Sequence, residues 1–277
     1  MSKVWFITGA ARGLGAAIAK AALAAGDNVV VSGRRLEPLH QVFAEYGERV
    51  LAVPLDVSNE AQALAAAEQA VTQFGRIDVL VNNAGYGQLA PFEDNFSADA
   101  DNQFATNVFG VFNVCRAVLP VMRQQRSGHV FNVSSMGGVL GMGGAALYCA
   151  SKFAVEGFSE SLAQEVAQFG IKVTLVEPGV FRTDFLDASS AVFGQRALDD
   201  YAAFTAKVKG ASAAYNHQQT GNPAKLGAAL VQLANSETPP LRYLAGSDAY
   251  QQVTGKLQKM LGEMEQWREL SHSTDGI

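Results

Sequence analysis

A glycine-rich stretch near the N-terminus constrains the fold of this chain more than any other feature. The β-branched and aromatic run Val4 to Ile7 leads into the stretch 8–15, TGAARGLG, after which apolar residues recur at helical spacing. The order strand, glycine turn, helix places bare backbone N–H groups at a helix N-terminus, where they bind anions. Glycine permits the tight turn and lets a pyrophosphate approach without a Cβ in the way. The sequence therefore predicts a nucleotide phosphate site at Gly9, Gly13, Leu14 and Gly15, with a plain glycine turn as the alternative.

Short apolar runs alternate with helical stretches along the chain. Strands are expected at 4–7, 28–32, 50–55, 77–81, 130–133, 172–176 and 241–244. Helices are expected at 60–74, 97–125, 152–169, 223–234 and 250–261. This alternation predicts an α/β protein with a Rossmann fold, a doubly wound parallel sheet of about seven strands with helices on both faces. The ligand crevice of such a sheet lies outside the carboxyl ends of its strands.

Composition favours one domain over residues 1–277 that binds small molecules. Of the 277 residues 48% are hydrophobic, which is ample for a core, and no linker or repeat divides the chain. A net charge of −5 argues against nucleic acid or an anionic membrane surface as the main partner. The N-terminal apolar run is too short for a signal peptide. Cys115 and Cys149 have no metal-ligand spacing around them, so we expect free thiols, no metal and a cytoplasmic location.

Two arginines, Arg34 and Arg35, follow the second expected strand directly after Gly33. A carboxylate at this strand end would hold the ribose hydroxyls of NAD, whereas arginine pairs with the 2′-phosphate of NADP. Here the acid is absent, Gly33 leaves room, and Arg12 in the glycine loop can converge on the same phosphate. The pattern favours NADP(H) over NAD(H), and solvated arginines at a helix start are the alternative.

A phenol and an ammonium lie four residues apart in the stretch 147–152, LYCASK. Four residues is about one helical turn, so Tyr148 and Lys152 project from the same face. A free tyrosine has a pKa of about 10, and a neighbouring positive charge favours its phenolate. We interpret the pair as a general acid and base, although a Tyr and a Lys at this spacing usually make an ordinary surface contact.

Other polar and small residues fall where expected strands end. They are Asp56, Val57, Asn83, Ala84, Gly85, Ser134, Ser135, Pro178, Gly179 and Val180. Turn formation is the commonest use of such residues, but their place at one edge of a parallel sheet favours contacts with a cofactor. Asn107 lies amid apolar residues of the 97–125 helix, where it is either a core amide or part of an adjoining polar site.

Taken in order, these residues resemble the short-chain dehydrogenase/reductase family. The matching motifs are Thr8-Gly9-x-x-x-Gly13-x-Gly15, Asp56, Asn82-Asn83-Ala84-Gly85, Asn107, Ser135, Tyr148-x-x-x-Lys152, and Pro178-Gly179 with Thr183. The separation from Tyr148 that the family uses selects Ser135 over Ser134. The resemblance covers residues 3–183 and rests on many motifs in the family's order.

The resemblance implies an oxidoreductase that interconverts a small apolar carbonyl compound and its alcohol by hydride transfer. Tyr148 would donate or accept the proton, and Lys152 would lower the pKa of the phenol and hold the nicotinamide ribose. Ser135 would orient the substrate oxygen, and Asn107 would hold a water that connects Lys152 to solvent. Cofactor contacts are implied at Asp56, Val57, Asn83, Ala84 and Gly85, and toward the nicotinamide at Pro178, Gly179, Val180 and Thr183.

The part of the chain after the core 1–183 has two interpretations. Residues 184–221 form an insert rich in aromatic residues, and 222–277 supply a helix, a strand and a terminal helix. The insert is predicted to be either a mobile lid over the substrate or core packing of a longer C-terminus. Its length and arrangement resemble the hydroxysteroid and retinol dehydrogenase-like branch of the family.

Two alternative functions and a homo-oligomeric assembly are also expected from the sequence. A 3-oxoacyl thioester reductase would dock an acidic carrier, for which Arg196, Lys207 and Lys209 in the insert offer thin support. A sensor or scaffold that binds NADP(H) without chemistry is the alternative from another class. The family resemblance implies a homo-oligomer, dimer or tetramer, through the two long helices, where Phe109, Phe112 and Phe158 lie at the interface or in the core.

Overall fold

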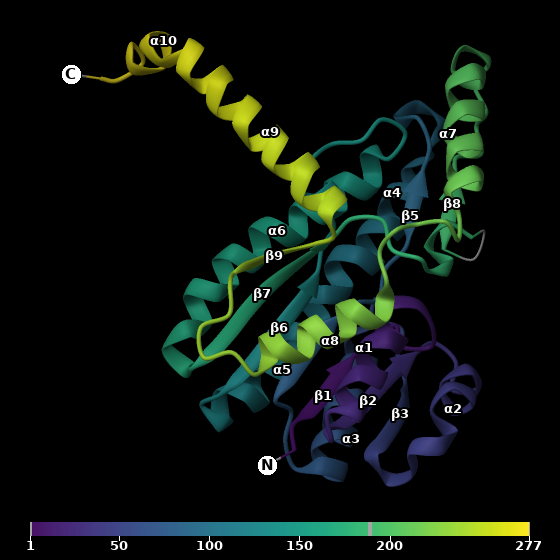
Figure 1. Ribbon diagram of the computed structural model, residues 1–277, viewed down its shortest axis with the longest axis vertical. Helices are drawn as coiled ribbons and strands as arrows, with labels where there is room; N and C mark the ends of the chain where they lie inside the picture. The colour runs from purple at the N-terminus through teal and green to yellow at the C-terminus, as the bar shows by residue number, and fades with distance from the viewer. Residues whose placement is uncertain (1, 188–189, 277) are drawn as a thin grey trace.

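The computed structural model describes residues 2–187 and 190–276, and a seven-stranded sheet forms its centre (Figure 1). The strands are β1 (Val4–Ile7), β2 (Asn28–Gly33), β3 (Val50–Pro54), β4 (Val79–Asn82), β6 (Gly128–Val133), β7 (Ile171–Pro178) and β9 (Arg242–Ala245). Their order is β3-β2-β1-β4-β6-β7-β9, and every neighbouring pair is parallel. The predicted doubly wound parallel sheet is confirmed, and its strand order reverses between β1 and β4, where such sheets bind ligands.

Helices cover both faces of the sheet (Figure 1). They are α1 (Gly13–Ala24), α2 (Glu37–Phe43), α3 (Glu60–Phe74), α4 (Ser97–Phe104), α5 (Gly110–Gln125), α6 (Ala146–Val166), α7 (Ala202–Tyr215), α8 (Pro223–Ala234), α9 (Ser247–Gln266) and α10 (Arg268–His272). Side chains alternate between the faces of a strand, so Val4 and Phe6 of β1 join the core under α3, α5 and α6. Trp5 and Ile7 point the other way, into the core under α1, α2 and α8.

A second sheet and a break in one expected helix are among the features that were not predicted from the sequence. A second, two-stranded parallel sheet pairs β5 (Gly87–Leu89) with β8 (Ala191–Phe193). The expected helix 97–125 is interrupted by one π-helical turn, η3 (Ala105–Phe109), which joins α4 to α5. The segment Ser97–Gln125 is long and apolar enough to cross a membrane. Half of its most apolar stretch of 18 residues is buried inside the fold, and a core helix of a soluble protein passes the same test of length and composition.

His129 on β6 is a buried histidine that bears on stability. Its Nε2 lies 2.9 Å from Thr174 Oγ1, and its ring stacks on Phe131 at 4.0 Å between centroids. Burial, with Lys172 and Lys3 nearby, lowers the pKa of His129 to about 3. An unfolded histidine has a pKa of about 6.5, so between about pH 6.5 and 3 the unfolded chain binds a proton that the folded chain does not.

We therefore expect His129 to make the fold less stable as pH falls below about 6.5, by up to about 1.4 kcal/mol per pH unit. In His129→Phe the ring contact with Phe131 is kept and the titrating group is removed. Urea unfolding across this pH range should show a steeper loss of free energy of unfolding in the parent than in the variant. Equal slopes for the two proteins would mean that His129 is not the acid-sensitive group.

Candidate active site

The glycine loop between β1 and α1 has the shape of an anion cradle. Gly9 and Gly13 adopt positive φ angles of 65° and 58°, which L side chains rarely adopt. A Cβ on Gly15 would lie 2.5 Å from the carbonyl oxygen of Gly9, so only glycine fits there. Among the described residues no side chain caps the start of α1, and its first turn carries no acid. Its first N–H groups are therefore available to a phosphate.

The loop after β4 fixes this cradle from behind. The Asn83 side-chain amide donates to the carbonyl oxygens of Thr8 (2.9 Å) and Gly9 (3.1 Å). Thr8 Oγ1 in turn accepts from the backbone N–H groups of Asn83 and Ala84 at 2.9 and 3.0 Å. Asn83 thus holds the glycine loop in position with its own side chain, while Gly85 lies farther along beside Lys152, whose Nζ would be 3.8 Å from an added Cβ.

The predicted phosphate-binding arginines occupy different places. Arg34 and Arg35 are exposed at the end of β2, next to the end of β3. The Nη2 of Arg12 donates to Ser190 Oγ at 2.7 Å and so links the glycine loop to the insert. The structure therefore brings Arg34 and Arg35 to the expected strand end and directs Arg12 toward Ser190.

The end of β3 presents Asp56 to the same edge of the sheet. Its Oδ1 accepts from the backbone N–H of Ser58 at 3.0 Å and from Ser58 Oγ at 2.7 Å, which makes an Asx turn before α3. Val57 is buried, and its carbonyl oxygen accepts from Asn113 Nδ2 of α5 at 3.0 Å. Both residues thus also have the turn-forming role that the sequence left open.

Tyr148, Lys152 and Ser135 meet beyond the end of β6. Helix α6 begins at Ala146, so Tyr148 lies in its first turn and Lys152 one turn later on the same face. The Nζ of Lys152 donates to the carbonyl oxygen of Val133 at 2.8 Å and lies 5.9 Å from the centre of the Tyr148 ring. Ser135 hydrogen-bonds with Tyr148, and its Oγ accepts from the N–H of Gly137 at 3.0 Å. All three side chains are buried.

Burial dominates the pKa values of Tyr148 and Lys152. Burial raises the pKa of Tyr148 to about 12, while its hydrogen bond with Ser135 acts in the opposite direction. Burial lowers the pKa of Lys152 to about 8, against the attraction of Glu156. Desolvation therefore favours the neutral form of both groups. The phenol is thus protonated near neutral pH, the form that can donate a proton.

Asn107 lies in the π-helical turn η3, beside this group. Its Nδ2 donates to the carbonyl oxygen of Tyr86 at 3.0 Å and to Ser151 Oγ at 3.1 Å, and its Oδ1 accepts from the N–H of Tyr86 at 3.1 Å. The amide therefore ties the loop after β4 to α6. The amide is buried, and its nitrogen and oxygen both have hydrogen-bond partners. Asn107 is therefore a core amide and also part of the polar site beside Lys152.

The segment after β7 runs from the Tyr148 side to the glycine loop. The N–H of Gly179 donates to Ala245 O at 2.9 Å, and the N–H of Val180 donates to Asp248 Oδ2 at 2.8 Å. Thr183, three residues on, lies against the glycine loop, where its Cβ is 3.6 Å from the position of a Cβ on Gly13. Asp248 was not predicted as a site residue, although its place one residue into α9 is typical of an acid at a helix start.

A partly buried charge cluster lies behind Lys152 and was also not predicted. Glu156, one turn after Lys152 on α6, pairs with Arg242 of β9. Arg242 also contacts Glu177 at 2.8 Å and Glu160 at 2.5 Å. Burial raises the pKa of both Glu156 and Glu177. The cluster links α6 to β7 and β9, and it therefore fixes the helix that carries Tyr148 and Lys152 against the edge of the sheet.

Apolar side chains surround the Tyr148 ring on its outer side. Phe185, from the turn η6 (Asp184–Leu186), lies 5.7 Å from it between ring centroids. Leu89 and Met142 pack against the same cluster. The predicted insert 184–221 is thus ordered over its described residues into η6, β8 and α7, and it forms one wall of the space next to Tyr148.

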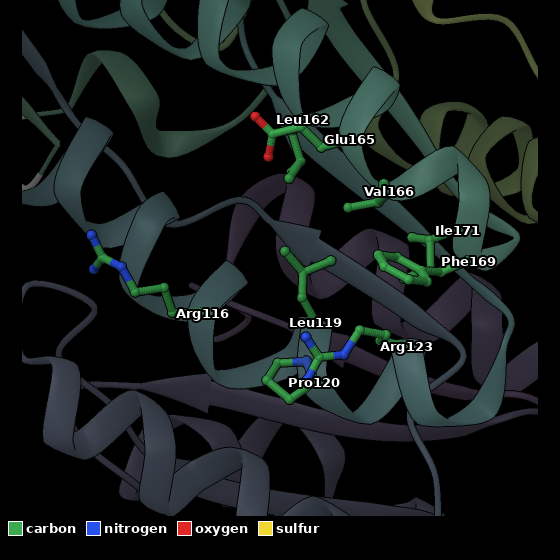
Figure 2. A pocket seen from close by; sticks show the side chains of 9 residues that line it. All are labelled: Arg116, Leu119, Pro120, Arg123, Leu162, Glu165, Val166, Phe169 and Ile171. Carbon is green, nitrogen blue, oxygen red and sulfur yellow. The ribbon is translucent and has the colours of Figure 1, made fainter.

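A separate pocket lies on the outer surface between α5 and α6. Figure 2 shows it, with Leu119 of α5 and Leu162 of α6 on either side and Arg116, Arg123 and Glu165 also lining it. None of the residues of the Tyr148 group lines this pocket. It is therefore distinct from the space where a substrate would meet Tyr148.

The glycine cradle and the Tyr148 group lie at the same edge of one parallel sheet, joined by the segment 179–183. A nucleotide held in the cradle would extend along this edge to a protonated phenol. Fold and site together define a nicotinamide-nucleotide-dependent oxidoreductase that acts on a CH–OH group or the corresponding carbonyl.

Sequence comparison agrees with this class. The family model described as short chain dehydrogenase matches residues 3–192, and the chain belongs to that family. It is 43% identical over 272 residues to Oxidoreductase BOA17 of Botryotinia fuckeliana (strain B05.10), covering 98% of each chain. It is 40% identical over 248 residues to a 3-ketodihydrosphingosine reductase of Bacteroides thetaiotaomicron, covering 88% of each.

Solved structures share the fold, and two of the three described below hold a nicotinamide nucleotide. A short-chain dehydrogenase from Streptomyces avermitilis has a TM-score of 0.90 and 41% identity, and the match covers 100% of this chain and 99% of that one. A metagenomic short-chain oxidoreductase in complex with NADP has a TM-score of 0.70 at 28% identity, covering 88% and 97%. A 3-ketoacyl-(acyl-carrier-protein) reductase from Brucella melitensis complexed with NADH has a TM-score of 0.75 at 28% identity, covering 89% and 98%.

Proposed function

We propose that this protein is an NADP(H)-dependent oxidoreductase that interconverts a ketone or aldehyde and an alcohol, with Tyr148 as general acid and base. The observation that carries the proposal is the convergence of Tyr148, Ser135 and Lys152 at the sheet edge that also holds the glycine cradle. The cradle suits a dinucleotide because a Cβ on Gly15 would close it. NADP(H), when bound, supplies or accepts the hydride.

The roles proposed for the chain's own residues are those implied by the family resemblance, and the positions of the residues support them. Tyr148, protonated near neutral pH, donates its proton to the carbonyl oxygen during reduction, and Ser135 beside it orients that oxygen. Lys152 stabilises the phenolate that remains and contacts the nicotinamide ribose. The glycine loop, Asp56 and the 83–85 and 178–183 segments hold the rest of the cofactor, and Asn107 with a water relays the proton to Lys152.

The substrate class follows from the apolar wall around Tyr148. Phe185, Leu89 and Met142 favour a ketone or aldehyde attached to an apolar group. The relative named 3-ketodihydrosphingosine reductase supports a carbonyl carried on a long alkyl chain. Docking of an acidic carrier protein is less favoured, because two of the cations that would bind it already contact aromatic rings. Arg196 lies 6.0 Å from the Phe96 ring centre, and Lys209 lies 5.3 Å from that of Phe193. The insert 184–221 acts as the substrate lid.

The proposal is tested by loss of NADPH absorbance with purified protein against a panel of carbonyl compounds. The panel contains long-chain aliphatic ketones, aryl and steroid ketones, aldehydes and a 3-oxoacyl thioester. We expect the protein to reduce the apolar ketones of this panel. Tight NADPH binding without turnover on any compound would favour the sensor or scaffold, and turnover confined to the thioester would favour the acyl reductase.

Arg34 is expected to decide the preference for NADPH. Loss of a charge-assisted pair with the 2′-phosphate costs on the order of 2 kcal/mol, so Arg34→Ala should weaken NADPH binding roughly 30-fold and leave NADH nearly unchanged. Fluorescence titration with both cofactors measures this. Arg49→Ala is the matched control, since Arg49 donates to Leu23 O at 2.8 Å, away from the loop. Equal weakening of NADPH and NADH would show that the 2′-phosphate is bound elsewhere.

The assembly is a homo-oligomer formed through α5 and α6. Phe109, the last residue of η3 before α5, is 53% exposed, and Phe112 packs on Phe158 of α6 at 4.4 Å between centroids. The pocket of Figure 2 lies between the same two helices and adds Leu119 and Leu162 to this surface. An apolar surface that spans two long neighbouring helices suits the self-complementary contact of a two-fold dimer.

A further inference from the structure

Glu156 of α6 lies one helical turn beyond Lys152, on the side of the helix that faces β7 and β9. Residues four apart are neighbours on one face of a helix. Both side chains are buried, with Lys152 7% and Glu156 5% exposed. The chemistry proposed for Tyr148 and Lys152 does not use this carboxylate. A buried carboxylate is costly to a fold unless it is paired, so its place beside Lys152 indicates a role in the charge of that residue.

The ammonium of Lys152 contacts a carbonyl oxygen and no carboxylate. Its Nζ donates to Val133 O at 2.8 Å, and over residues 2–187 and 190–276 no ion pair joins it to an acid. A carbonyl dipole offsets only part of the cost of burying an ammonium. Burial lowers the pKa of Lys152 to about 8, and the charge of Glu156 acts against this shift. The ammonium is therefore supported by a charge one helical turn away.

Arg242 fixes the Glu156 carboxylate from the side of the sheet. This arginine belongs to β9, the edge strand next to β7 (Figure 1), and it pairs with Oε2 of Glu156. It also contacts Glu177 of β7 at 2.8 Å and Glu160 of α6 at 2.5 Å. Pairing with a guanidinium favours the ionised form of Glu156, against its burial. Three acids thus share one base, and the surplus charge is negative.

The loop after β6 closes over the other oxygen of the Glu156 carboxylate. A Cβ on Gly138 would lie 3.0 Å from Glu156 Oε1 and closer still to Ser134 Oγ, so glycine leaves room for both groups. Ser134 directly precedes Ser135, which hydrogen-bonds with Tyr148. The carboxylate of Glu156 therefore lies against the loop that presents Ser135 to Tyr148.

The other titratable and charged groups on this side of α6 do not replace Glu156. Tyr148 is uncharged near neutral pH, because burial raises its pKa to about 12. Lys256 of α9 is a cation, and its ammonium donates to a backbone carbonyl oxygen in the loop after β6. Glu177 and Glu160 both contact the guanidinium of Arg242, which offsets part of their charge. Glu156 is therefore the acid in this group that can support the ammonium one turn before it.

We propose that Glu156 is a positioning residue, which keeps Lys152 in its ammonium form through the negative charge that Arg242 holds in place. The role rests on the proposed function, in which a charged Lys152 stabilises the phenolate of Tyr148. A neutral Lys152 gives the phenolate no such stabilisation, so reduction should slow as pH rises through the pKa of Lys152. Without the charge of Glu156 this pKa is lower, and the loss of rate begins at a lower pH.

The test is the pH dependence of kcat/KM for ketone reduction at saturating NADPH. In Glu156→Gln the side chain keeps its size and loses its charge. We expect the basic limb of the profile to move down by about one pH unit, as for a unit charge one helical turn away. Arg242 keeps Glu160 and Glu177 in this variant, so no cation is left unpaired. Thermal unfolding and NADPH titration show that the fold is kept.

Two further variants separate the charge of Glu156 from a structural tie between α6 and β9. Glu156→Asp keeps the charge, so its basic limb should stay near that of the parent even if the rate falls. Glu160→Gln removes a half-exposed acid that also contacts Arg242 at 2.5 Å, and it should leave the limb in place. If Glu156→Gln does not fold, Glu156→Met makes the same neutral change with an apolar side chain of similar length.

A second measurement follows Lys152 without any turnover. NMR titration of protein labelled with carbon-13 at lysine Cε reports the ionisation of each ammonium, and Lys152→Met assigns the signal. The midpoint for Lys152 should fall in Glu156→Gln and stay unchanged in Glu160→Gln. A fall in this midpoint without reduction of any ketone would support the charge effect and count against the proposed function. The proposal is overturned if the midpoint and the basic limb of Glu156→Gln match those of the parent, even where its rate is lower.

Discussion

Tyr148→Phe is expected to remove carbonyl reduction while the protein still binds NADPH. The variant keeps the ring that packs on Phe185 and loses the hydroxyl that Ser135 contacts. General acid catalysis contributes about 10²- to 10⁴-fold, so the rate of NADPH oxidation should fall at least roughly 100-fold. The affinity for NADPH should change by no more than about twofold, because the lost interaction is made in the transition state.

Stopped-flow measurement of NADPH oxidation, with fluorescence titration of the cofactor, separates the two effects. Tyr46→Phe is the control, because Tyr46 packs on Phe43 far from the sheet edge that holds Tyr148. Turnover of the Tyr148 variant within about tenfold of the parent would be incompatible with its role as the acid.

Gly15→Ala is expected to weaken cofactor binding through the backbone alone. Its Cβ would lie 2.5 Å from Gly9 O and 2.6 Å from Asn83 Nδ2, and neither can move without opening the glycine loop. Overpacking of this kind costs about 1–3 kcal/mol. If that cost falls on the bound form, NADPH and NADH should both bind roughly 10- to 100-fold more weakly.

A matched control separates the cradle from a general effect of adding a methyl group. At Gly157 in α6 an added Cβ would meet nothing within 4 Å, so Gly157→Ala should bind both cofactors as the parent does. Thermal unfolding of both variants shows whether the fold is kept. Unchanged NADPH affinity in a folded Gly15→Ala protein would place the pyrophosphate outside this loop.

The sheet and much of the site could be predicted because their signals are local in the sequence. Runs such as Val4 to Ile7, the glycines of 9–15 and the Tyr148 to Lys152 spacing each determine a piece of backbone from neighbouring residues. The parallel sheet then brings the strand ends together without further information. The expected sheet was confirmed by the strand order, and the expected family by the match to residues 3–192.

Features set by contacts far apart in the sequence could not be predicted. Asp248 reaches Val180, and Arg242 reaches Glu156, across a large part of the chain. The pairing of β5 with β8 depends on three-residue strands whose pattern is too short to recognise. Burial raises the pKa of Tyr148, and no local pattern in the sequence reports burial. The lid and the catalytic roles stay predictions.

The most direct test of the central proposal follows the hydride itself. Purified protein is incubated with NADPH that carries deuterium at both C4 positions of the nicotinamide and with the apolar ketone that gives most turnover, and the product is analysed by mass spectrometry. We expect one deuterium on the carbinol carbon of the alcohol for each NADPH consumed, and none with Tyr148→Phe. Consumption of NADPH without labelled alcohol would contradict carbonyl reduction as the activity of this site.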